Sequence, residues 1–245
     1  MRLLRQIVGI RLLVSLAGSV VAFSSVPLLT VPGLPAASGR DRFEGRLLLE
    51  PVDGPGMVMR LGDEFAYVDP AGKRWVAPAG LETDGASIPR VLYSVVGPPF
   101  DGSYLKAAVI HDAASPSDVD SWQDAHRMFY YALLRCGVGE AKAKVMYAAV
   151  YHFGPRWATP GQPAPYANNI VAERLAKSAG RPAELRYDRE RQAIDAVGPE
   201  APPTEQVDAV ERELFDQCRR WVEREHPSLA EIEDWTGGMS EAIDQ

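Results

Sequence analysis

The residues best suited to chemistry are two histidines and two aspartates in the middle of the chain: Asp84, His111, Asp112 and His126. Two imidazoles with one or two carboxylates suffice to hold a divalent metal that keeps an open coordination position. Alternatively, His111 can act as a general base that activates water while a neighbouring carboxylate orients it. We therefore predict catalytic roles for His111, Asp112 and Asp84, or a metal site formed by His111, His126 and Asp84.

Signatures of several enzyme classes are missing from the sequence. It contains no Walker loop, no Gly-x-Gly-x-x-Gly fingerprint, no His-Glu-x-x-His helix and no Gly-x-Ser-x-Gly elbow. The histidines and aspartates therefore remain as the candidates for a hydrolase-type site, and their spacing indicates neither a substrate nor a cofactor beyond a divalent metal.

The same polar residues also have ordinary structural roles. Asp84 and Ser87 flank a Gly-Ala pair and suit turn and capping positions. His126 lies in the apolar stripe that runs from Trp122 to Cys136, where a lone histidine is usually a core residue with satisfied hydrogen bonds. A non-catalytic cell-envelope or phage-type structural module, with these residues in a buried polar network, is the alternative to the enzyme.

Helices must position the two histidines. Hydrophobic periodicity predicts three helices, over Ser103–Ala114, Val119–Cys136 and Glu140–Phe153. A further short helix is expected upstream, over Pro89–Val96. Ser117 or Asp118 is the expected N-cap of the helix that carries His126. Because a short loop joins the helices of His111 and His126, we expect the two side chains on neighbouring elements.

Before these helices the sequence changes to short strands separated by turn dipeptides. The expected strands are Phe43–Glu50, Met57–Leu61, Glu64–Val68 and Lys73–Val76. The expected fold is therefore α+β: a small antiparallel sheet with one covered face, then a helical subdomain carrying the His-Asp motif, then a C-terminal helical extension.

Several of these motifs resemble a known family. Asp84 to Arg90, the pair His111-Asp112, the helix end from Phe129 to Val138 and the run from Met146 to Trp157 look like domain of unknown function 1353, found in phages and bacteria. The resemblance covers Phe43 to Trp157, roughly half of the chain. It carries no established biochemical function.

The family pattern His-Asp-x-x-Tyr followed by Ala-Asp-x-x-Phe is in turn similar to the His-Asp helices of phospholipase A2. This chain departs from it, because Ser115 stands at the tyrosine position and His126 at the second aspartate. It also lacks the disulfide-braced calcium loop of those enzymes. An imidazole in place of a carboxylate favours a softer metal such as zinc over calcium.

The N-terminal residues 1–40 predict an export signal. Arg2, Arg5 and Arg11 precede an apolar run from Leu12 to Val21, and Ala22-Phe23-Ser24 suits signal-peptidase cleavage. Cleavage predicts a periplasmic or extracellular protein. Because the uncharged span is as long as a bilayer crossing, an uncleaved inner-membrane anchor is the alternative. Membrane contact is expected through residues 1–40 alone.

The chain is thus divided into residues 1–40, a core domain over 41–158 and a charged, Pro-interrupted helical extension over 159–245. The extension includes a predicted helix over Glu205–Glu225 and a short one over Leu229–Ile243 that is broken at Gly237-Gly238. The first has a thin apolar stripe that suits either the core domain or a cell-envelope or protein partner.

Charge and cysteine content narrow the functional classes. The net charge of −7 disfavours nucleic-acid binding. Two cysteines cannot form a disulfide framework, although Cys136 and Cys218 could pair with each other in an oxidising compartment. Because Cys136 is on an apolar helical stripe, we predict a buried thiol there instead.

Overall fold

The computed structural model describes residues 41–53, 58–83, 102–115, 119–158, 170–179, 184–188, 193–199 and 201–237. All of them fall within one compact unit, Pro35–Gln245. The predictions on residues 1–40, on Asp84 and on the helix Pro89–Val96 lie outside the described residues.

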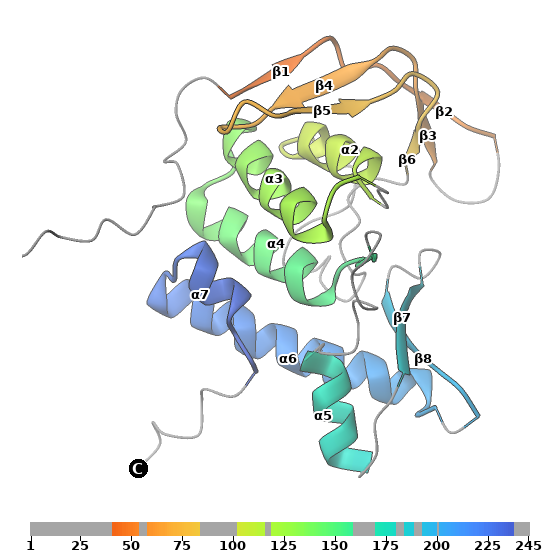
Figure 1. Cartoon of the computed structure of the whole chain (residues 1–245), viewed down its shortest axis with the longest axis vertical. Helices are drawn as coiled ribbons and strands as arrows, with labels where there is room; N and C mark the ends of the chain where they lie inside the picture. Colours follow the sequence, from red (N-terminus) through yellow and green to blue (C-terminus); the bar gives the residue numbers. More distant parts are fainter. Residues whose placement is uncertain are drawn as a thin grey trace, which may run out of the picture. The chain divides into compact units, whose positions relative to one another are not determined.

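The predicted α+β class is confirmed (Figure 1), and the described strands before the helices form two small antiparallel sheets. The first has the order β1-β4-β5, and the second has the order β2-β3-β6. Their bounds are β1 Arg42–Glu44, β2 Leu49–Pro51, β3 Met59–Leu61, β4 Phe65–Val68, β5 Arg74–Ala77 and β6 Glu82–Thr83.

The prediction of one continuous strand over Phe43–Glu50 is wrong, because β1 and β2 belong to different sheets. Gly45 separates them with a φ of +85°, a conformation that favours glycine. A Cβ at this position would lie 2.8 Å from the carbonyl oxygen of Glu64. The chain therefore turns out of the first sheet at Gly45 and pairs again only at β2.

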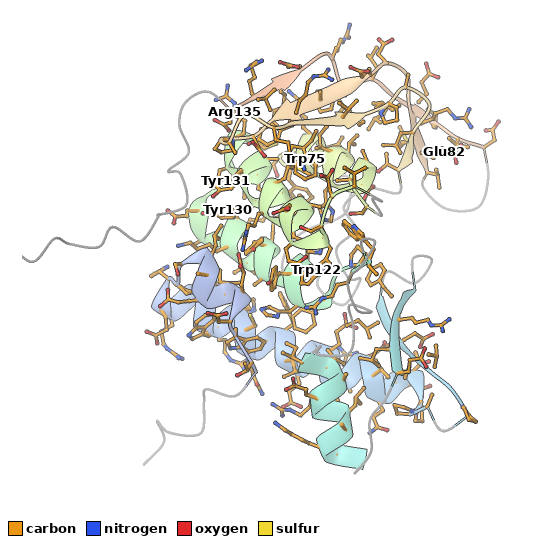
Figure 2. The ribbon with its side chains drawn as sticks, viewed as in Figure 1. Trp75, Glu82, Trp122, Tyr130, Tyr131 and Arg135 are labelled. Atoms are coloured by element: carbon orange, nitrogen blue, oxygen red, sulfur yellow. The ribbon has the colours of Figure 1, made fainter. Side chains whose placement is uncertain are left out.

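The alternation of a strand with one covered face is present along β5, where Trp75 and Ala77 are buried while Arg74 and Val76 are exposed. The central strand β4 does not show it, because all four of its residues are buried. Trp75 lies between the sheet and the helices (Figure 2). The helix α2 (Leu105–Ala113) packs against β4 and β5 and closes this side of the core.

The predicted central helices are present with bounds close to those expected. After α2 come α3 (Trp122–Arg135), which packs on α2, and α4 (Glu140–Phe153), which packs on α3 (Figure 1). The predicted N-cap of α3 at Ser117 or Asp118 is wrong. The hydroxyl of Ser121 caps this helix by accepting a hydrogen bond from the backbone N–H of Asp124 at 3.1 Å.

The C-terminal extension contains more structure than its charged sequence predicts. A helix α5 (Ile170–Ala179) is followed by an antiparallel hairpin of β7 (Glu184–Asp188) and β8 (Ala193–Val197). Mixed charges hide this hairpin in the sequence, because among its side chains that the structure describes only Leu185 and Ile194 are buried. The hairpin was not predicted.

The last two helices are α6 (Thr204–Glu225) and α7 (Leu229–Glu233). The second starts where predicted, at a capping box between Ser228 and Glu231, and it ends at Asp234, before the predicted break at Gly237-Gly238. The predicted continuation to Ile243 lies outside the described residues. The described structure continues to Gly237, which has a φ of +72°.

The apolar side of α6 packs on α4, so of the two alternatives for this stripe the structure has the core domain. The buried residues of α6 include Val207, Leu214, Phe215, Cys218 and Val222. The helix α5 and the strand β8 also pack on α6.

The two cysteines are free. Cys218 is buried, which raises the pKa of its thiol to about 12. Cys136 is half-buried rather than buried as predicted, because it is the C-cap of α3, and its pKa is also raised by burial. Among the described helices, none combines the length and the apolar character that a membrane crossing requires.

Candidate functional site

His111, near the end of α2, and His126, in the first half of α3, lie side by side in the core. Nε2 of His111 is 2.8 Å from Nδ1 of His126, and the ring centroids are 5.0 Å apart. The side chains are nearly inaccessible to solvent, with exposures of 1% and 0%. The packing of α3 on α2 therefore brings together the two histidines that the sequence analysis identified on separate helices.

A backbone carbonyl determines the direction of hydrogen bonding through this histidine pair. Nε2 of His126 lies 3.1 Å from the carbonyl oxygen of Pro155, just after α4. A carbonyl only accepts, so Nε2 of His126 donates and carries the proton. In the neutral ring Nδ1 is then the acceptor, and His111 donates to it from Nε2. The lone pair of a neutral His111 is consequently on Nδ1.

Aromatic rings enclose the pair. The edges of Trp122 and Trp157 meet His126 at centroid distances of 5.6 and 6.0 Å, and Phe129 packs on His111 at 4.8 Å. Figure 2 shows Trp122 at the start of α3. Burial holds the pKa of His126 well below its usual value, and the neighbouring His111 and Arg156 lower it further. His126 is therefore neutral at physiological pH.

Asp112 follows His111 in α2 and is half-buried. Its Oδ2 accepts a hydrogen bond of 2.5 Å from the hydroxyl of Thr83. Thr83 is buried at the end of β6 and pairs there with Met59 of β3. This bond ties the second sheet to the helix that carries His111. Sequence reasoning gave Thr83 no role, and its position next to Asp84 was the one available signal.

The predicted metal set does not fit this geometry at His126, because both of its ring nitrogens are engaged by His111 and Pro155. Asp84, the third predicted ligand, lies outside the described residues. Within the part of the chain that the structure describes, no three His, Cys, Asp or Glu side chains are grouped as metal ligands. Metal roles for His111 and Asp84 stay predictions.

Sequence reasoning also missed a second polar cluster, between α3, α4 and α7. Two guanidinium nitrogens of Arg127, Nε and Nη2, donate to the carboxylate of Glu233. The hydroxyl of Tyr147 donates to the same carboxylate at 2.7 Å. Nearby, Nε2 of the buried His152 donates to the carbonyl of Ile232 at 2.7 Å. These contacts join residues far apart in the chain, so no local pattern reveals them.

The fold and the site together define a class: an α+β domain with a buried, carbonyl-oriented histidine pair. Residues 59–150 match the model of the family described as Protein of unknown function (DUF1353). The matched segment runs from β3 into α4 and contains both histidines. This match supports the identification of that segment as a DUF1353 domain.

Two uncharacterized proteins of Sinorhizobium fredii are similar to the chain. The protein y4iH is 37% identical over 158 residues, which cover 64% of this chain and 66% of y4iH. The protein y4jT is 45% identical over 103 residues, which cover 42% of this chain and 31% of y4jT. Both relatives thus extend beyond the matched region. No solved structure matches the chain significantly.

Proposed function

We propose that the protein is a hydrolase in which His111 is the general base that activates water, and in which His126 orients the ring of His111. One observation carries this proposal: His111 contacts His126, and His126 contacts the Pro155 carbonyl, so that His111 donates to His126 and His126 donates to the carbonyl. A base needs a defined lone pair, and this order assigns the lone pair of His111 to Nδ1.

Proton transfer follows from that order. When Nδ1 of His111 takes a proton from water, the ring becomes an imidazolium whose Nε2–H already points at His126. His126 is neutral, so its Nδ1 remains an acceptor and stabilises the new charge. Asp112, held by Thr83, and Asp84 are the proposed carboxylates that balance it.

Two classes of hydrolysable bond are tested: a carboxylic ester, which is the bond that phospholipase A2 cleaves, and a phosphodiester. The departures at Ser115 and His126 weaken the phospholipase resemblance, so it does not select between them. The probes are therefore 4-nitrophenyl acetate and bis(4-nitrophenyl) phosphate. His111→Gln should lower kcat/KM on the accepted probe by about 10²- to 10⁴-fold, the usual contribution of a general base. The matched control is His226→Asn, at an exposed residue with a φ of 49° that asparagine tolerates.

The proposal fails if the parent hydrolyses neither probe faster than a folded His111→Gln variant. Metal analysis of the same samples separates a base from a ligand. Stoichiometric zinc that is present in the parent and lost in His111→Gln would assign His111 to a metal instead.

The second candidate is the non-catalytic cell-envelope or phage-type module. The near-complete burial of both histidines favours this candidate. The hydrogen bonds of Asp112, His111 and His126 join β6, α2, α3 and the segment after α4, as a polar network with a structural role would do. This candidate gains if His111→Gln unfolds the protein and the parent shows neither hydrolysis nor bound metal.

Location and partners belong to the same proposal. Residues 1–40 carry the export signal or the inner-membrane anchor, and the acidic chain is proposed not to bind nucleic acid. Since the apolar side of α6 is covered by α4, a partner of the C-terminal helices would contact their charged, exposed side. Secretion of a fusion to residues 1–40 tests the location.

A further inference from the structure

The segment Gly154–Trp157 contains the carbonyl that orients His126, and it is held in place by unusually specific contacts. The segment leaves α4 at Gly154, where a Cβ would lie 2.5 Å from the carbonyl oxygen of Val150. A side chain cannot fit there without displacing the backbone. Pro155 follows and restricts its own φ. The local sequence thus brings the Pro155 carbonyl away from the helix in a restricted direction.

Arg156 anchors the segment to the helices on both sides of His126. Its guanidinium lies 4.3 Å from the centre of the Trp122 ring, at the start of α3. Its Nη2 donates to the carbonyl of Tyr151, in the last turn of α4, at 2.8 Å. The cation therefore connects the first turn of α3 with the last turn of α4 next to Pro155.

Trp157 anchors the other side of the carbonyl. Its indole Nε1 donates to the carbonyl of Asp120 at 2.8 Å, just before α3. The carboxylate of Asp120 binds Lys73, which lies 3.7 Å from the centre of the Trp75 ring in β5. Through these contacts the segment is tied to the sheet as well as to α3.

We propose that Arg156 and Trp157 are positioning residues, which hold the Pro155 carbonyl at His126 and thereby select the tautomers of both histidines. Neither side chain donates a hydrogen bond to an imidazole among the described contacts. Both act by fixing a backbone acceptor. Loss of this acceptor removes the contact that fixes the proton of His126 on Nε2, and with it the direction that this contact gives to the bond with His111. The inference rests on the proposed function for its catalytic meaning, but the tautomers themselves are independent of any activity.

The test uses the full chain with ¹⁵N-labelled histidine. Long-range ¹H–¹⁵N spectra distinguish a protonated from a bare ring nitrogen. In the parent, His126 should show a protonated Nε2 and a bare Nδ1, and His111 should show a protonated Nε2. Trp157→Phe keeps the ring but removes the donor to Asp120, so the ¹⁵N shifts of His126 should move toward the average of the two tautomers.

The matched control is Trp235→Phe, which makes the same substitution at a buried indole that packs on His152 and Trp221, away from the pair. It should leave the ¹⁵N shifts of His111 and His126 unchanged. Arg156→Met removes the guanidinium and keeps the apolar stem, so it provides a second test if Trp157→Phe does not fold.

Folded variants with the parent's tautomers would overturn the proposal. So would loss of folding in both Trp157→Phe and Arg156→Met, because the segment would then serve stability alone. A tautomer shift in a chain that hydrolyses neither probe would retain the positioning role and remove the hydrolase. Hydrolysis that depends on His111 but is unchanged in a folded Trp157→Phe variant, with unchanged ¹⁵N shifts, would retain the hydrolase and remove the positioning role.

Discussion

His126 and His152 make the same bond in two regions of the molecule, with different consequences. Each is fully buried, and each donates from Nε2 to a backbone carbonyl, of Pro155 at 3.1 Å and of Ile232 at 2.7 Å. Burial lowers the pKa of both, that of His152 to about 3. At His126, however, Nδ1 meets the second imidazole of His111, whereas the rings of Tyr151 and Trp235 pack around His152.

A buried imidazole bound to a carbonyl is therefore not a site by itself. At His152 the bond ties α4 to α7, beside the cluster of Arg127, Tyr147 and Glu233. At His126 the same bond also orients a neighbour that can exchange protons. What separates the two regions is the second imidazole, that of His111, next to His126.

The same substitution at both histidines should distinguish the two regions most clearly. Glutamine can reproduce the Nε2 donor, so His126→Gln and His152→Gln should each cost a similar free energy of unfolding, about 1–3 kcal/mol. Only His126→Gln should lower hydrolysis, by about 10- to 100-fold, as loss of an orienting partner does. Denaturant unfolding and the probe hydrolysis measure the two effects. Equal activity of the two variants would contradict the distinction.

Glu233→Ala should weaken the region of His152 and leave the histidine pair intact. The substitution removes the carboxylate that accepts hydrogen bonds from both Arg127 and Tyr147, and this carboxylate belongs to a side chain that is only 13% exposed. We expect a loss of about 2–3 kcal/mol in the free energy of unfolding. Glu213→Ala, at an exposed pair with Arg174, should cost less than about 1 kcal/mol. If the ¹⁵N shifts of His126 changed in Glu233→Ala, the two regions would not be independent.

Acid should destabilise both regions. In the unfolded chain histidine takes up a proton near pH 6.5, whereas His152 stays neutral in the fold until about pH 3. Stability from this neutral imidazole is complete above pH 6.5 and is lost as the pH falls toward 3. The slope is about 1.4 kcal/mol per pH unit for each such histidine. His152→Gln should flatten the decline in unfolding free energy measured between pH 6 and 4. An unchanged slope would contradict the assignment.

The exposed His226 provides the smallest effect. It is the left-handed C-cap of α6, and its backbone N–H binds the carbonyl of Val222. Asparagine tolerates this conformation, so His226→Asn should change the free energy of unfolding by less than about 0.5 kcal/mol. Thermal or denaturant unfolding measures it. A larger loss would show that histidine itself matters at this cap.

Much of the fold followed from local patterns. The stripe from Trp122 through Phe129 to Leu133 has helical spacing, and α3 lies where it predicts. Two misses have local physical causes. Gly45 takes a left-handed conformation that splits the predicted strand, and Ser121 is closer to the first turn of α3 than Ser117 or Asp118. The β7–β8 hairpin was missed because its charged residues obscure the few buried ones.

By itself the sequence determined which residues can do chemistry and which helices carry them, since composition and periodicity are local properties. It placed His111 and His126 on adjacent helices. Only the tertiary structure decided what they do together. The orienting acceptor is the backbone carbonyl of Pro155, and carbonyls are alike at every position of a sequence. Which of them meets His126 depends on how α4 ends and how Arg156 and Trp157 are held, and those contacts exist only in the folded chain.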